Sequence, residues 1–279
     1  MKESLTPEKI YKDFLAGDIG REHAVELLIS LIESSDNTEI RVASIHKLEK
    51  LNFHNEKIYK ILENCLISDE NAVIRASVAN YILHNFSEDG LPALKWVIQY
   101  EKSPLVLKTF FDSIETFQIP QLKQIRKELL IWNKDYAVKI GIVPQESKFF
   151  LDLEALFANS KIDNEIEPQF FEDFKKLSNV KNGEPWLVIN KQHVEILNFN
   201  YFNWKWVKEN SDIIDSLYGF KYLDVYFNSL IKYNIDNDSH FVLPSSIGKL
   251  TNLKKLILRG NMLKEIPNSL GNLFSLKEL

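Results

Sequence analysis

The segment LPSSIGKLTNLKKLILRGNMLKEIPNSLGNLFSLKEL, residues 243–279, repeats one pattern almost twice. Leu256 and Leu279 occupy equivalent places in the two copies, which gives a period of about 23 residues, within the range of short solenoid repeats. The alternating leucines of LKKLIL, residues 253–258, predict a short strand whose leucines face a core. The pattern therefore predicts a stack of layers, each made of one strand and one turn.

Composition and charge restrict the classes of protein to which this chain can belong. The 279 residues are 45% apolar and include 34 basic against 39 acidic residues, a net charge of -5, which disfavours a nucleic-acid partner. The N-terminal residues lack the apolar core of a signal peptide, and no run approaches the roughly 20 apolar residues of a membrane span. The single cysteine excludes an internal disulfide, so we expect a cytoplasmic protein.

A second, helical repeat occupies the N-terminal part of the chain. Its apolar stripes recur about every 34 residues; they are Ala24, Leu27, Leu28, Leu31 and Ile32, then Ile58, Ile61, Leu62, Cys65 and Leu66, then Leu91, Leu94 and Ile98. Each stripe precedes a second helix, for which Asp36, Asp69 and Ser103 stand where an N-cap is expected. Residues 5–16 are expected to form a further helix that covers the first pair.

The second helices also share an arginine. Arg41 in DNTEIRVASIHKL and Arg75 in DENAVIRASVANYIL are equivalent, and the residues around them resemble the HEAT repeat family over roughly residues 20–117. The resemblance implies that aspartate and arginine side chains form a ladder between neighbouring repeats. Asp36, Arg41, Asp69 and Arg75 are therefore expected to be structural residues.

The C-terminal pattern has earlier, weaker copies. LKKLILRGNML, residues 253–263, matches LxxLxLxxNxL; FKYLDVYFNSL, residues 220–230, fits the same template; and VEILNF, residues 194–199, matches its strand portion. These residues resemble the leucine-rich repeat (LRR) family over residues 190–279, and most closely the subclass common in intracellular signalling and immune-type receptors. The resemblance implies that Asn228 and Asn261 bond the exposed backbone where the chain bends away.

In a leucine-rich horseshoe the outward-facing strand residues line the concave face, where partners usually bind. Alternation along the strands assigns to that face Ile196, Asn198 and Asn200 on the first strand, Tyr222, Asp224 and Tyr226 on the second, and Lys255, Ile257 and Arg259 on the third. The second and third strands combine tyrosines with basic residues, which are common at interface hot spots, so we predict that they bind a partner. The alternative is ordinary solvated sheet surface.

The two repeats together predict the fold class. We expect an α-helical HEAT-like solenoid at residues 1–145, a helical junction at 146–185, and an α/β leucine-rich-repeat solenoid, the horseshoe, at 186–279. An aromatic segment at 199–210 is expected to fill an irregular repeat, with a recognition patch as the alternative. The last repeat is incomplete, so we expect the natural protein to continue with further repeats.

No residue pattern points to catalysis. The chain has no glycine-rich loop before a Lys-Ser or Lys-Thr pair and no HExxH, and His46 and His54 do not have the spacing of a zinc site. Cys65 lies in an apolar stripe and is expected to be buried and unreactive. We therefore expect no catalytic residue, no metal and no cofactor.

The expected function is that of a non-enzymatic scaffold or sensing arm that binds a protein partner through the concave face, the helical surface or both. The alternative is the regulatory N-terminal arm of a larger LRR-containing signalling enzyme, GTPase-like, whose catalytic domain would follow the repeats. That alternative rests on the repeat subclass alone. A HEAT-type lyase or DNA-repair enzyme is a third and weaker possibility, because no catalytic residue can be named for it.

Overall fold

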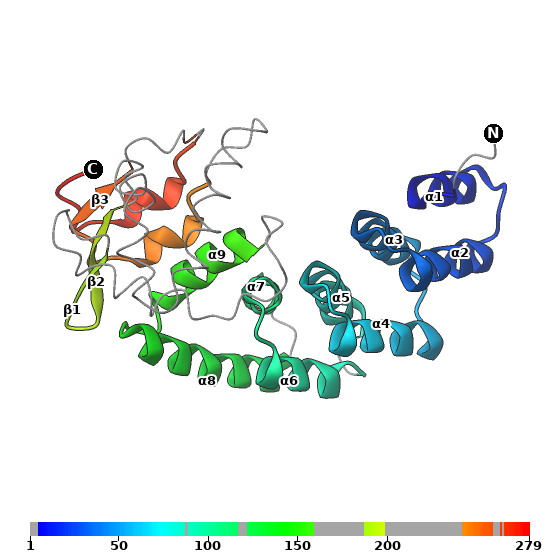
Figure 1. The fold of residues 1–279 in the computed structure, drawn as a ribbon, viewed down its shortest axis with the longest axis horizontal. Coiled ribbons are helices and arrows are strands. Elements are labelled where there is room, and N and C mark those ends of the chain that lie inside the picture. The colour runs from blue at the N-terminus through cyan, green and yellow to red at the C-terminus, as the bar shows by residue number, and fades with distance from the viewer. Residues whose placement is uncertain are drawn as a thin grey trace, which may run out of the picture. The chain divides into compact units, whose positions relative to one another are not determined.

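The computed structural model describes residues 5–86, 89–116, 122–158, 187–198, 242–258, 263 and 265–279. These residues are mostly helical, with one small three-stranded sheet in the C-terminal part (Figure 1). The chain divides into two compact units: Met1–Glu101 with Leu105–Leu129, and Lys102–Pro104 with Leu130–Leu279. The expected helical N-terminal part and strand-bearing C-terminal part are both present.

The first unit is built from helices that pack in pairs. The helices are α1 (Pro7–Ala16), α2 (Arg21–Ser34), α3 (Thr38–Leu51), α4 (Glu56–Ser68), α5 (Ala72–Asn85), α6 (Leu91–Tyr100) and α7 (Pro104–Thr116). Helix α2 packs on α3, and α4 packs on α5. Contacts of α3 with α5 and of α4 with α6 join successive pairs, and α1 covers α2 and α3.

Asparagine is the N-cap residue of three of these helices. Asn37 accepts bonds from the amides of the second and third residues of α3, at 2.8 and 3.1 Å, and Asn71 caps α5 in the same way. Asn55 caps α4. The expected caps Asp36 and Asp69 are therefore wrong: an asparagine one or two residues later takes that place, because its side chain also accepts bonds from the free amides of the first turn.

The apolar stripes of the sequence supply the core of the first unit. Leu28, Ile32, Leu62 and Leu94 are each completely buried. Cys65 is 8% exposed and lies among them, as expected from its place in the stripe. Burial of aliphatic side chains of this size stabilises the fold by about 1.5–3 kcal/mol each, so the repeated stripes contribute strongly to the packing of the helices.

Two helices precede the sheet of the second unit. Helix α8 (Lys123–Ile140) crosses the division between the units, and α9 (Ser147–Ala158) follows a short loop. That loop starts at Gly141, whose φ of +85° favours glycine and whose amide donates to the carbonyls of the last turn of α8. Every residue of α9 from Ser147 to Ala155 is buried, so this helix lies inside the unit.

The sheet begins with a hairpin. Strand β1 (Leu187–Asn190) pairs antiparallel with β2 (His193–Asn198), and the two-residue turn Lys191-Gln192 has φ of +49° and +66°. Two positive φ angles are typical of the type I′ turn that matches the twist of a hairpin, where Asn-Gly is the usual sequence. The register shifts by one residue beside Ile189, a bulge in the pairing.

The rest of the second unit is stacked in layers. Strand β3 (Lys255–Ile257) pairs parallel with β2, and Lys255 forms a parallel bridge with Glu278. On the other side, α9 packs on the short 3-10 helix η2 (Ser245–Lys249), which packs on its equivalent η3 (Asn268–Asn272). The helical elements α9, η2 and η3 stack in that order. Strands β2 and β3 and residue 278, which follow them in the chain, stack in the same order.

The order of the strands corrects one expectation. Leu197 pairs directly with Leu256, and these two residues occupy equivalent positions in the LRR template. However, the template placed the segment 220–230 between them, whereas β2 and β3 are direct neighbours. The expected order of strands is therefore wrong at this point, because the hydrogen bonds between β2 and β3 leave no space for another strand. Residues 220–230 themselves lie outside the described residues.

Candidate functional site

The candidate site is the solvent-facing side of the sheet formed by β2, β3 and residue 278. Ile196 of β2 lies beside Lys255 of β3, and Lys255 lies beside Glu278. Residues that lie beside each other in parallel strands point to the same side, so the three side chains form one column. Their neighbours Leu197 and Leu256 are 1% and 0% exposed and face the core. We call Ile196, Lys255, Ile257 and Glu278 the sheet face.

The sheet face combines aliphatic groups with one charged pair. The side chains of Ile196 and Ile257 are half-buried. Lys255 Nζ lies 3.0 Å from Glu278 Oε2, and these two side chains are 25% and 66% exposed. An ion pair this open to water contributes little to stability, about 0–1 kcal/mol. The pair nevertheless places one ammonium group and one carboxylate side by side on an otherwise aliphatic surface.

Only part of the predicted concave face can be placed. Lys255 and Ile257 lie on the sheet face, as alternation along the strand requires. Tyr222, Asp224, Tyr226 and Arg259 lie outside the described residues, as do Asn228 and Asn261 of the predicted ladder. Asn198, which alternation placed on the same face, is 1% exposed, so the expectation that it faces solvent is wrong.

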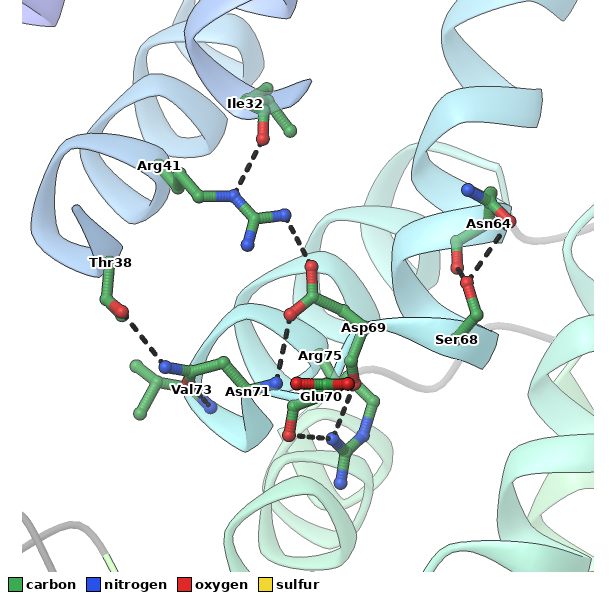
Figure 2. A network of polar contacts seen from close by, with 10 residues as sticks. All are labelled: Ile32, Thr38, Arg41, Asn64, Ser68, Asp69, Glu70, Asn71, Val73 and Arg75. Carbon is green, nitrogen blue, oxygen red and sulfur yellow. Dashed lines mark hydrogen bonds and ion pairs between the residues drawn. The ribbon is translucent and has the colours of Figure 1, made fainter. Parts of the chain in front are cut away.

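A ladder of polar contacts runs across the helix pairs of the first unit (Figure 2). The Arg41 guanidinium group donates to the Ile32 carbonyl at 2.7 Å and forms an ion pair with Asp69 of the next pair. Asp69 also accepts a bond from the Asn71 amide at 3.0 Å, and the Asn71 side chain donates to Thr38 at 3.0 Å. These contacts therefore connect the start of α3 with the start of α5.

The next rung uses a different acid. Arg75 Nε and Nη2 donate to the two oxygens of the Glu101 carboxylate, at 2.9 Å each, and Nη1 donates to the Asp69 and Glu70 carbonyls. The Glu101 side chain is only 7% exposed. Asp36, the first predicted member of the ladder, is exposed to solvent. Both guanidinium groups already bond a carboxylate and carbonyl oxygens of neighbouring residues, which leaves them poorly placed to bind an external anion.

A buried carboxylate fastens the hairpin to the loop before α9. Glu146 is 1% exposed and accepts bonds from the Val194 amide at 2.9 Å and from His193 Nδ1 at 2.8 Å. Asn252, which precedes β3, lies 2.9 Å from the same ring nitrogen. The cluster joins residues from three separate parts of the second unit, and its carboxylate orients the histidine ring.

Helix α9 carries further buried polar groups. Lys148 forms an ion pair with Asp152, and Asp152 accepts a bond from Ser246 of η2. Glu154 is 1% exposed, and burial raises the pKa of its carboxyl group to about 8, an effect that the Tyr136 hydroxyl partly offsets. At neutral pH Glu154 is therefore mostly protonated. These groups lie inside the unit and are not available to a ligand from solvent.

Two other kinds of site, a nucleophilic cysteine and a metal centre, are not favoured among the described residues. Burial raises the pKa of the Cys65 thiol, and Asp69 adds to the effect, so the thiolate that nucleophilic chemistry needs is disfavoured. Within the described ranges, His, Cys, Asp and Glu side chains form no group of three that could hold a metal ion. In the same part of the chain no helix has the length and hydropathy that crossing a membrane requires.

Sequence reasoning missed the Glu146–His193–Asn252 cluster and the buried charges of α9. Glu146 and His193 are 47 positions apart, and no motif connects them. Carboxylates this close together on a charge-rich helix favour a solvated face, but Asp152 and Glu154 are 6% and 1% exposed, so that expectation is wrong. No local signal in the sequence indicated this burial, because the polar residues of α9 lie on one side, as they do on a surface helix; they are Ser147, Lys148, Asp152 and Glu154.

Comparison with known proteins gives no relative: no family model, no curated protein and no solved structure matches this chain.

Proposed function

We propose that this protein is a non-enzymatic interaction scaffold or sensing arm that binds a protein partner on the sheet face, with the helical surface of the first unit as a second contact area. The carrying observation is the column Ile196–Lys255–Glu278 with Ile257 beside it: these side chains are half-buried to exposed, whereas Leu197 and Leu256 of the same strands are buried. The regulatory-arm alternative would use the same surface.

The chemistry of the sheet face suits a protein partner. Half-buried isoleucines offer an apolar contact area, and the Lys255–Glu278 pair offers a donor and an acceptor in fixed positions. Protein interfaces combine a small apolar centre with hydrogen-bonding groups at its rim. A small-molecule site, in contrast, is normally concave and encloses most of its ligand. Tyr222, Asp224, Tyr226 and Arg259 lie outside the described residues, and their contact with a partner stays a prediction.

We also propose the finer fold assignment, a HEAT-like solenoid followed by a leucine-rich-repeat solenoid. The first is supported by the paired helices and by the Arg41–Asp69 contact between successive pairs. The second is supported by the parallel register of Leu197 with Leu256 and by the stacking of η2 on η3. In both solenoid types, binding surfaces extend across several repeats, which is the property that a scaffold needs.

The test compares two double variants in affinity capture from the source cell, with crosslinking mass spectrometry to locate contacts. The first, Lys255→Ala with Ile257→Ala, removes a cation and a branched aliphatic side chain from the sheet face. The matched control, Val242→Ala with Lys249→Ala, removes the same kinds of group from exposed positions beside and within η2. Circular dichroism and thermal melting show that each variant is folded.

We expect the wild-type protein and the control to retain a partner that crosslinks near β3, and the sheet-face variant to lose it. A partner that the folded sheet-face variant retains fully, with crosslinks confined to α1–α7, would move the binding site to the helical surface. Turnover of a substrate by the purified chain would contradict the non-enzymatic assignment.

A further inference from the structure

Helix α8 packs through one side and leaves aliphatic groups on the other. Leu130, Ile131 and Val138 are 55%, 49% and 77% exposed. Single exposed aliphatic residues are common on protein surfaces, but these three lie on one stripe, because residues seven and eight positions apart follow each other along one side of a helix. The opposite side of α8 supplies the core, and its residues are at most 6% exposed; they are Ile125, Leu129, Tyr136, Ala137 and Ile140.

Two exposed lysines lie within the same stripe. Lys127 and Lys134 are seven residues apart, which is about two helical turns. The positions three and four residues away from each lysine, where an ion pair within a helix forms, hold no acid; they are Lys123, Gln124, Leu130, Ile131, Ala137 and Val138. Within the described ranges no carboxylate of another element pairs with these lysines either. We call Lys127, Leu130, Ile131, Lys134 and Val138 the α8 face.

The charge of α8 is opposite in sign to that of the whole chain. The helix carries five basic against two acidic residues, whereas the chain has a net charge of -5. The acids Glu128 and Asp135 lie at one border of the α8 face, and the Glu128 carboxylate already accepts a bond from the Gln124 side chain at 2.7 Å. The face itself is therefore positive, which favours a negatively charged partner.

We propose that the α8 face binds an amphipathic helix of a partner protein, in which acidic residues seven positions apart have leucine-like residues between them. Side chains return to the same side of a packed helix at that spacing, so two such carboxylates meet Lys127 and Lys134 together. The apolar residues between them then cover Leu130 and Ile131. None of these residues belongs to the sheet face, so each binding proposal can fail without the other.

The order of groups along the α8 face favours an acidic helix over other occupants. A helix that lies on a lipid surface separates its apolar side from its lysines, whereas Lys134 lies between Leu130 and Val138 in one row. A second copy of α8 would bring four lysines together in one interface, and like charges at an interface are unfavourable. An acidic amphipathic helix matches both the cations and the apolar groups.

The experiment measures binding of three end-capped fluorescent peptides to the full chain by fluorescence anisotropy. The acidic peptide, EAQLLAQEAQLLAQE, has glutamates at the proposed spacing with leucines between them, and the other two peptides replace every glutamate by lysine or by glutamine. Each is titrated against the wild-type chain and against Lys127→Glu with Lys134→Glu. The matched control, Lys12→Glu with Lys50→Glu, makes the same change of charge at exposed positions of α1 and α3. Circular dichroism shows that every variant is folded.

We expect the wild-type chain and the matched control to bind the acidic peptide about tenfold more tightly than the glutamine peptide, and the lysine peptide most weakly. The variant Lys127→Glu with Lys134→Glu reverses this order, a gain of binding to the lysine peptide that misfolding cannot produce. Ile131→Ala weakens the acidic peptide about fivefold, whereas Ile67→Ala, at an exposed position of α4, leaves its binding unchanged.

Three results would overturn the proposal. Equal binding of the three peptides, or an order that the double variant does not reverse, would show that the lysines select no carboxylate. Sedimentation of the wild-type chain with vesicles of phosphatidylserine and phosphatidylcholine, while no peptide binds, would assign the α8 face to a lipid surface. A dimer in analytical ultracentrifugation that Ile131→Ala dissociates would assign it to a second copy.

Discussion

Replacing Glu154 by glutamine tests whether α9 carries a carboxyl group that folding keeps neutral. The pKa of Glu154 is raised from 4.5 to about 8 by burial. Below pH 4.5 both the folded and the unfolded chain hold the proton, and the group has no effect on stability. Between 4.5 and 8 the unfolded chain releases the proton while the folded chain keeps it, so stability falls as pH rises. Above 8 the folded chain releases it too.

The size of the effect follows from the pKa difference. Each pH unit between the two pKa values costs about 1.4 kcal/mol, so at pH 7 the wild-type chain loses about 3 kcal/mol relative to pH 4.5. Glutamine has almost the same shape and does not ionise. The variant Glu154→Gln should therefore match the wild type within about 1 kcal/mol at pH 4.5 and exceed it by about 3 kcal/mol at pH 7.

The assay is urea denaturation at pH 4.5, 5.5, 6.5 and 7.5, with hydrogen exchange of the α9 amides as the local readout for the second unit. Glu265→Gln, a change at an exposed position of the same unit, is the matched control and should leave the pH profile unchanged. A constant difference between Glu154→Gln and wild type at every pH would refute the reasoning, because it would show that the side chain contributes packing but no titration.

Three further predictions concern two glycines, a helix cap and the hairpin turn. Gly248→Ala should destabilise the second unit by about 2 kcal/mol, because a Cβ there meets a backbone oxygen at 2.6 Å, whereas Gly271→Ala should be neutral within about 0.5 kcal/mol. Asn71→Ala should cost about 1 kcal/mol through the lost cap of α5, and Asp36→Ala less than about 0.5 kcal/mol. Replacing the Lys191-Gln192 turn by Asn-Gly should stabilise the hairpin by about 0.5–1 kcal/mol. Urea denaturation measures all three. A reversed order within the glycine pair or the Asn71/Asp36 pair, or a turn variant less stable than the wild type, contradicts the corresponding structural reason.

The parts of the fold that could be predicted are those that local patterns decide. Apolar residues at helical spacing identify the buried faces of α2 and α4, and LxxLxL identifies β3 and its alignment with Leu197. The location of the caps was predicted within two residues, because aspartate and asparagine both stabilise free amides. The pattern could not decide whether the aspartate or the nearby asparagine accepts the bonds from these amides.

The parts that could not be predicted depend on contacts between distant segments. Direct pairing of β2 with β3 is decided by how the layers stack, and the strand template alone could not show that these two strands are neighbours. The burial of Asp152 is decided by Ser246, which lies 94 positions further along the chain. Most of the predicted partner-binding residues fall outside the described ranges, so that prediction stands on Lys255 and Ile257 alone.

The pairing of β2 with β3 also has a consequence for folding kinetics. The Glu195 and Lys254 side chains that bond across these strands are 59 positions apart, whereas the bond between Ser269 and Ser245 in the next layers spans 24. Closing the longer loop costs only about 0.8 kcal/mol more chain entropy than closing the shorter one. Rates respond more strongly to such separations than stabilities do. We therefore expect the hairpin and the η2–η3 layers to form early, and the contacts of β2 with β3 and of α9 with η2, which span 59 and 94 positions, to form later.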